Sequence, residues 1–288
     1  MSVVLPIQGF MPLSLSNRRT YGDLSLRHPA VHFPSFAFMK NLIVLQFLAL
    51  LWVAPLRAAL ISHEGFSGYP ANATVNNRNG GTGWQSAWNG AGMVVSPGRA
   101  FPGLVASGNA LRTTGGTLAS IRPFTTLGFE TLRTSSRRFG LDGTELWLSF
   151  LARRDTNFTT ADYAGLSLLD GGQKLFVGCT SGGSHWSLQL FDLGTVPSSI
   201  TLPTATPIVT GETALLVLRL QFGVNGTQDR VELFVNPPPG VTPTTPDASH
   251  TGADFRFNQV RVQTGTGAAA AMSFDEIRLG EGFGDVVP

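Results

Sequence analysis

TALLVLRLQFGVNGTQDRVELFVNP, residues 213–237, is the stretch that decides the fold. In its first half, apolar residues recur at every second position and share one face of an extended chain. These residues are Ala214, Leu216, Leu218, Leu220 and Phe222. The alternation resumes at Val231, after a loop with Asn225-Gly226 that favours a hairpin turn, and it ends at Pro237. A period of two indicates strands, so the stretch predicts a β-hairpin.

The rest of the chain has the composition of an all-β protein. Its 288 residues include 34 Gly and 18 Pro, and only 13% are charged, which is typical of many short strands joined by tight turns. Residues 145–151 are apolar on both faces, so we expect a central strand with Trp147 in the core. The pattern predicts a single-domain antiparallel β-sandwich or jelly roll over residues 59–288.

Residues 39–58 have the order of a secretory signal peptide. A charged start at Met39-Lys40 precedes an apolar run and small residues, and we expect cleavage after Ala58. The alternative is an uncleaved anchor, although the run is short for a membrane span, which needs about 20 residues. Residues 1–38 are either an unusually long leader or a start assigned too early. We therefore predict a secreted or cell-surface protein that meets a membrane only through the signal segment during export.

The charge balance and the single cysteine exclude two classes of protein. Residues 1–58 hold five of the 20 basic and one of the 18 acidic side chains, which leaves 15 basic and 17 acidic residues. A near-neutral chain does not support a surface that follows phosphates, so we expect no nucleic-acid partner. Cys179 stands alone, which excludes a disulfide framework, and we expect it to be buried.

Four segments resemble strands of the concanavalin A-like lectin/glucanase superfamily, in its laminin-G-like bacterial form. They are 146–150 (LWLSF), 216–222, 231–236 (VELFVN) and 274–280 (FDEIRLG). The resemblance implies a jelly-roll fold and a role with carbohydrate. The residues EGF…GGTGW…AW after position 63 and FGDVVP at 283–288 are similar to secreted bacterial proteins that often carry a PEP-CTERM sorting tail.

Catalytic residues of the superfamily are missing from the sequence. Members that resemble laminarinases carry Glu-x-Asp-x-x-Glu, because retaining hydrolysis needs two carboxylates about 5 Å apart. Asp275 and Glu276 are adjacent, and neighbours on a strand point to opposite faces. We therefore favour a protein without catalytic residues, with a polysaccharide hydrolase or lyase as the less favoured alternative.

One carboxylate is expected to be buried and to need a partner. Asp275 has the parity of Ile277 and Leu279, which places it inward unless a bulge intervenes. Pairing of the first and last strands would bring Glu64 near Asp275, and the two could hold a structural Ca²⁺ ion with backbone carbonyls. The alternative is a carboxylate that is bonded to Arg278 or to backbone amides.

Four residues are candidates for sugar binding, because aromatic rings offer flat apolar faces and amides set orientation. They are Trp84, Trp88, Asn89 and Trp186. The alternative is that the two loop tryptophans hold the Asn- and Gly-rich segment to the sheet. Arginines 133, 137, 138, 153 and 154 form either a basic patch for acidic polysaccharides or scattered solvated side chains.

Together these features predict a non-catalytic module that binds polysaccharide or another surface glycan. The alternative is a structural or adhesion module that contacts other envelope proteins.

Overall fold

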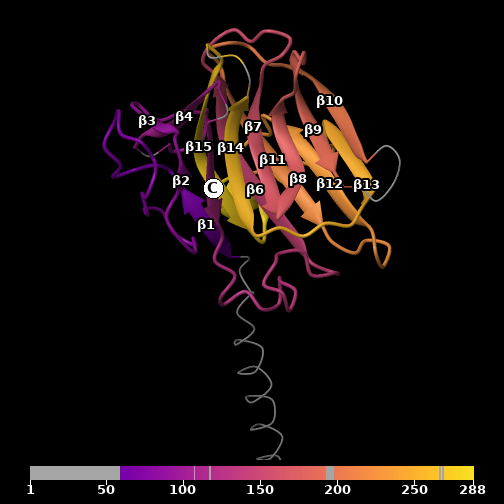
Figure 1. Ribbon diagram of the computed structural model, residues 1–288. Helices are drawn as coiled ribbons and strands as arrows, with labels where there is room; N and C mark the ends of the chain where they lie inside the picture. The colour runs from indigo at the N-terminus through magenta and orange to yellow at the C-terminus, as the bar shows by residue number, and fades with distance from the viewer. Residues whose placement is uncertain (1–58, 107, 117, 193–197, 266, 268) are drawn as a thin grey trace, which may run out of the picture. The chain divides into compact units, whose positions relative to one another are not determined.

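The computed structural model describes residues 59–288 except 107, 117, 193–197, 266 and 268, so the leader and signal segments of residues 1–58 lie outside the described residues. Two antiparallel sheets stack face to face (Figure 1). The strands are β1 (Leu60–Glu64), β2 (Asn89–Gly90), β3 (Met93–Val95), β4 (Ala110–Thr114), β5 (Leu118–Pro123), β6 (Glu145–Arg154), β7 (Tyr163–Asp170), β8 (Gly172–Cys179), β9 (His185–Phe191), β10 (Ser199–Pro207), β11 (Thr213–Gln221), β12 (Asp229–Val235), β13 (Ala248–Ala253), β14 (Gln259–Gly265) and β15 (Ala271–Gly280). The prediction of a single all-β sandwich domain is confirmed.

The two sheets contain different strands, so each has its own outer face. The eight-stranded sheet runs β13-β12-β11-β6-β15-β4-β3, with β1 also paired to β15. The seven-stranded sheet runs β10-β9-β8-β7-β14-β5-β2. The inner faces of both sheets bury one continuous apolar core. None of the helices in the described part of the chain is long and apolar enough to traverse a bilayer.

The hairpin predicted from residues 213–237 is formed by β11 and β12. Their register runs from Leu216 opposite Val235 to Gln221 opposite Arg230, and β11 also pairs with β6. The four alternating residues of β11 and Phe222 face the core, and none is more than 5% exposed. The hairpin therefore lies within the sheet, where both of its faces must be covered.

A second apolar cluster covers the outer face of this central region. Trp147, which is 3% exposed, packs against Phe283 of the short helix α2 (Phe283–Val286), with ring centroids 5.5 Å apart. Leu215 and Val217 belong to the same cluster. The Ser149 hydroxyl donates to the Val286 carbonyl at 2.6 Å and fixes this end of the chain. Both apolar faces of residues 145–151 are thus buried, as predicted.

Two further features concern a strand edge and the cysteine. Strand β10 contains Pro203 and Pro207 and lies at the edge of the seven-stranded sheet, a position where proline is tolerated. Cys179 is 1% exposed, as expected, and burial raises the pKa of its thiol. A buried, protonated thiol is a poor nucleophile.

Candidate functional site

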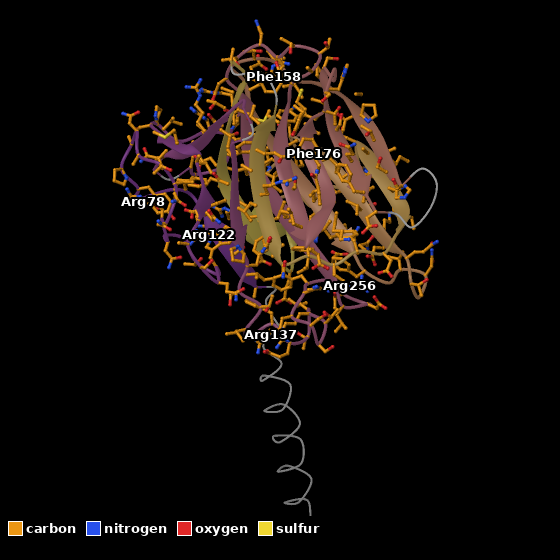
Figure 2. The ribbon with its side chains drawn as sticks, in the orientation of Figure 1. Arg78, Arg122, Arg137, Phe158, Phe176 and Arg256 are labelled. Atoms are coloured by element: carbon orange, nitrogen blue, oxygen red, sulfur yellow. The ribbon has the colours of Figure 1, made fainter. Side chains whose placement is uncertain are left out.

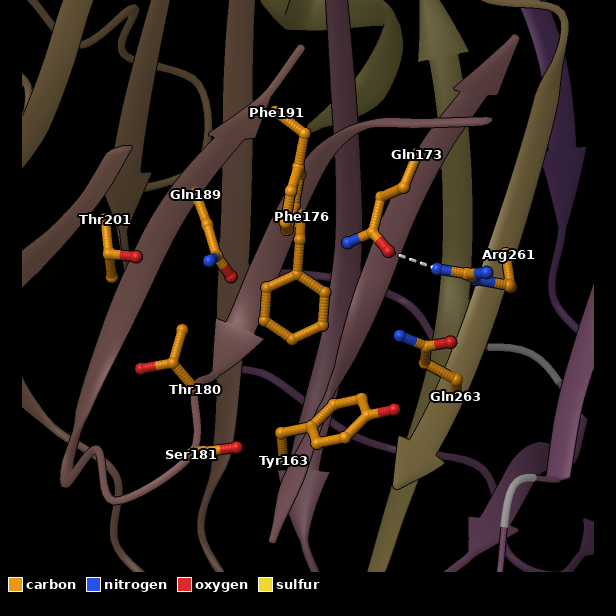
Figure 3. A pocket seen from close by; sticks show the side chains of 10 residues that line it. All are labelled: Tyr163, Gln173, Phe176, Thr180, Ser181, Gln189, Phe191, Thr201, Arg261 and Gln263. Atoms are coloured by element: carbon orange, nitrogen blue, oxygen red, sulfur yellow. Dashed lines mark hydrogen bonds between the residues drawn. The ribbon is translucent and has the colours of Figure 1, made fainter. Parts of the chain in front are cut away.

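A pocket of about 590 Å³ opens on the outer face of the seven-stranded sheet (Figure 3). It lies across the strand order β10-β9-β8-β7-β14. Its lining combines aromatic, amide and hydroxyl side chains with one arginine: Tyr163, Gln173, Phe176, Thr180, Ser181, Gln189, Phe191, Thr201, Arg261 and Gln263.

Strand alternation turns the polar lining residues outward. In β14, Val260 and Val262 are buried in the core, so Arg261 and Gln263 lie on the opposite face. Gln189 is placed in the same way between two core leucines of β9. In β8, a register shift puts Gln173 on the pocket face, because Leu168 pairs with Leu175 whereas Leu169 already pairs with Gln173.

Two glycines make room for the aromatic rings of the pocket. A methyl group on Gly165 would lie 2.7 Å from Cζ of Phe176, and one on Gly265 would lie 2.0 Å from Cε1 of Tyr163. Each ring therefore lies over a neighbouring strand where a side chain is missing. Phe176 is 2% exposed and forms a buried part of the pocket floor.

Arg261 gives the pocket a positive charge. Its Nη2 donates to Oε1 of Gln173, which Figure 3 shows as a dashed line. Within the described ranges, Arg261 forms no ion pair with a carboxylate, and its buried Nε has no hydrogen-bond partner. Burial lowers the pKa of Arg261, and the nearby Tyr163 opposes that shift.

A second polar atom beside Arg261 is also unpartnered. Ser167 lies directly opposite Arg261 in the β7–β14 ladder, and its buried hydroxyl has no hydrogen-bond partner among the residues described. The lining residues include no Asp, Glu or His. The pocket therefore presents a cation and several uncharged hydrogen-bonding groups, without a carboxylate of its own.

The tryptophans predicted to bind sugar lie elsewhere and pack inward. Trp88 is 1% exposed and Trp186 is 2% exposed, so neither ring offers a face to a ligand. Trp84 is half-buried and stacks on Phe124 with centroids 4.9 Å apart. Only Asn89, on the short strand β2, is exposed. For the two loop tryptophans, Trp84 and Trp88, this packing is the one that the alternative describes, in which they hold the Asn- and Gly-rich segment to the sheet.

The buried carboxylate of Glu64 binds side chains at both ends of this segment. Its carboxylate accepts hydrogen bonds from the Phe66 amide at 2.9 Å, the Tyr69 hydroxyl at 2.9 Å and Nε1 of Trp88 at 3.0 Å. It also forms an ion pair with Arg122, labelled in Figure 2, and both side chains are 1% exposed. Burial and the Glu64 charge raise the pKa of Tyr69 to about 12. The cation beside Glu64 is thus Arg122.

Asp275, which was expected to hold a Ca²⁺ ion together with Glu64, accepts hydrogen bonds from backbone amides instead. β1 and β15 do pair as expected, with Glu64 opposite Ile277. Asp275, however, accepts the backbone amides of Arg99 at 2.7 Å and Glu276 at 2.8 Å, and burial raises its pKa to about 8. This is the backbone-amide alternative, whereas Arg278 bonds Glu276 at 2.7 Å. Among residues 59–288, with the gaps noted above, no three His, Cys, Asp or Glu are grouped to hold a metal ion, and the calcium site stays a prediction.

Four of the five arginines considered as one basic patch have separate partners. Arg133 pairs with Glu130 and Arg138 with Asp170. Arg153 bonds an aspartate next to β6, and Arg154 donates to the Ile208 carbonyl at 2.8 Å. The arginine of the candidate pocket, Arg261, was not among the five.

No protein-family model matches this chain, and no curated protein matches it. Solved structures of the β-sandwich class are similar to it. One is the endo-β-1,4-glucuronan lyase of the fungus Trichoderma reesei, with 14% identity, 74% of this chain and 96% of that chain covered, and a TM-score of 0.47. Another is the endo-1,3-β-glucanase of Streptomyces sioyaensis, with 12% identity, coverage of 79% and 98%, and a TM-score of 0.47.

The globular domain of T. cruzi calreticulin is similar at 14% identity, with coverage of 80% of this chain and 90% of that chain and a TM-score of 0.47. These values are too low to assign a function to this chain.

Proposed function

We propose that the protein is a secreted, non-catalytic β-sandwich module that binds an acidic polysaccharide in the pocket of the seven-stranded sheet. The observation that carries this proposal is Arg261, a partly buried cation among amide, hydroxyl and aromatic side chains that has no carboxylate partner in the described chain. A buried charge needs a counter-charge, and the carboxylate of a uronic acid would supply one.

The remaining lining residues suit the rest of a sugar chain. Gln173, Gln189 and Gln263 each carry both donors and acceptors, which match the paired donor and acceptor roles of sugar hydroxyls. Tyr163 and Phe191 add apolar ring surface. The volume of about 590 Å³ lies within the usual range for small-ligand sites, so a short segment of a polysaccharide fits.

The lining supports binding without hydrolysis. Retaining and inverting glycosidases use two carboxylates across the scissile bond, and the lining residues contain none. Export is part of the same proposal, and it is supported by the signal-like residues 39–58.

The test is calorimetric titration of the purified protein with alginate and polygalacturonate, and with laminarin as the neutral comparison. We expect saturable binding of an acidic polymer, reduced at least about tenfold in Gln189→Ala/Gln263→Ala because hydrogen bonds to a ligand are lost. Gln259→Ala is the matched control, since Gln259 lies on the same face of β14 but outside the lining, and it should bind as the wild type does.

Two results would count against the proposal. Failure of the folded wild type to bind any acidic or neutral glycan would remove carbohydrate binding and leave the structural or adhesion alternative. A fall in polymer viscosity during incubation with the wild type would show cleavage and would refute the non-catalytic part.

A further inference from the structure

A second pocket, of about 520 Å³, opens on the outer face of the other, eight-stranded sheet. Three arginines and one carboxylate line it: Arg99, Arg112, Arg153 and Asp155. The pocket is independent of the one on the seven-stranded sheet, because the strands that contribute lining residues, β3, β4 and β6, all belong to the eight-stranded sheet.

Strand pairing brings the arginines to one place. Arg112 of β4 lies opposite Ser273 of β15, and Ser273 lies opposite Arg153 of β6. Arg99, from the segment between β3 and β4, reaches over the same position and donates from Nη2 to the Ser273 hydroxyl at 2.9 Å. Three arginines therefore come from neighbouring positions around Ser273.

Asp155 alone balances these charges. Its carboxylate oxygens lie 2.7 Å from Nε of Arg153, 3.5 Å from Nε of Arg112 and 4.0 Å from Nη2 of Arg99. Asp275 lies below Arg99, but its pKa is raised to about 8, so it is mostly protonated at neutral pH. Three cations against one anion leave the pocket with two positive charges.

The arginines also keep unused donors. The buried Nε atoms of Arg99 and Arg112 have no hydrogen-bond partner in the described chain, and Arg99 is only 6% exposed. Burial, followed by the charge of Arg153, lowers the pKa of Arg99. Neutralising Asp155 requires one arginine, so two positive charges and two buried N–H donors of this cluster remain unmatched.

We propose that this pocket binds a phosphate group, either as the free dianion or as the phosphomonoester of a larger molecule. Guanidinium groups match the oxygens of a tetrahedral anion by paired N–H donors. A phosphomonoester carries about −1.5 to −2 charges at neutral pH, which balances the two positive charges of the pocket. Carboxylates and sulfate esters carry one charge and would leave half of the excess in place.

The experiment is calorimetric titration of the whole protein with inorganic phosphate, with glucose 6-phosphate and with acetate. Arg112→Gln and Arg153→Gln are the test variants, because their side chains are 39% and 31% exposed and need not support the core. Arg138→Gln is the matched control, since Arg138 is 43% exposed, forms an ion pair with one aspartate and lies outside the pocket. Unchanged circular dichroism and melting temperature without ligand establish that each variant is folded.

We expect one saturable site for phosphate, no saturation with acetate, and a loss of affinity of about 10- to 100-fold in each test variant, the range for a lost charge-assisted hydrogen bond. Arg138→Gln should bind as the wild type does. Tighter binding of glucose 6-phosphate would identify the group as part of a larger molecule, and tighter binding of inorganic phosphate would identify the free ion. Absence of saturable phosphate binding, or an equal loss in Arg138→Gln, would overturn the proposal.

Discussion

Replacing Glu64 by glutamine tests the physical basis of the packing of the Asn- and Gly-rich segment. Oε2 of Glu64 accepts bonds from Tyr69, Trp88 and Arg122, and Oε1 accepts the Phe66 amide. An amide has one acceptor oxygen, so Glu64→Gln turns an N–H₂ group toward a donor whichever way it is oriented. It also leaves the Arg122 cation, 1% exposed, without its counter-charge.

Removing one partner of a buried ion pair costs about 3–5 kcal/mol, much more than the pair itself contributes. For a domain of this size that loss corresponds to a fall in melting temperature of about 6–20 °C. Equilibrium urea unfolding measures the free energy directly, with an unchanged m-value showing that the same surface is exposed. Glu212→Gln, at an exposed glutamate, is the matched control and should change stability by less than about 0.5 kcal/mol.

The double variant Glu64→Gln/Arg122→Gln isolates the pair. Each single change leaves the other charged or polar group buried without its partner. The loss of unfolding free energy in the double variant should therefore be at least about 1 kcal/mol smaller than the sum of the two single losses. A loss below about 1 kcal/mol in Glu64→Gln, or strict additivity in the double variant, would refute the view that this ion pair holds the segment to the sheet.

Three further predictions follow from burial in the two sheets. The pKa of Asp275 is about 8 in the folded protein and 3.8 in the unfolded chain. Between pH 3.8 and pH 8 the unfolded chain releases a proton that the folded chain keeps. The free energy of unfolding therefore falls by up to about 1.4 kcal/mol for each unit that the pH rises. Urea midpoints over that range should fall for the wild type and stay flatter for Asp275→Asn. A rise with pH in the wild type relative to the variant would show an ionised carboxylate, as a calcium site requires. Gly165→Ala places Cβ 2.3 Å from the Val177 carbonyl oxygen, so we expect a loss of about 1–3 kcal/mol and weaker glycan binding. Gly172→Ala, which meets nothing within 4 Å, is its control, and equal stability of the two variants would contradict the packing described. Trp186→Ala should cost about 3–5 kcal/mol by calorimetry, since the ring is 2% exposed, and a stable variant that only loses glycan binding would restore the sugar-binding interpretation of Trp186.

The architecture could be predicted because its signal is local. The alternation in residues 213–237 fixes which side chains of β11 face the core, whatever strands lie beside it. The two apolar faces of residues 145–151 likewise predict a strand covered on both sides. Phe283 and Val286 of α2 cover the outer face of this strand. Their contact joins segments that are distant in the sequence, so the periodicity of residues 145–151 does not predict it.

The sites could not be predicted because their partners are distant in sequence. In the sequence, Gln189 and Arg261 are ordinary outward residues of two strands. Only the strand order, in which β9 and β14 flank β8 and β7, shows that both residues line one pocket. The burial of Trp88 could not be predicted for a similar reason, since its orientation follows from Glu64 and from Arg122, which is 58 residues away from Glu64. Gln189 and Gln263, at alternating outward positions of β9 and β14, were the available signal for the pocket.

Mapping of amide chemical shifts during titration with an acidic oligosaccharide tests the proposed binding site most directly. We predict that the shifts concentrate on pocket-facing residues of β8, β9 and β14, with Gln173, Gln189 and Arg261 among the largest. Shifts confined to the segment around Trp84 and Asn89, with β8, β9 and β14 unchanged, would contradict the assignment of the ligand to this sheet.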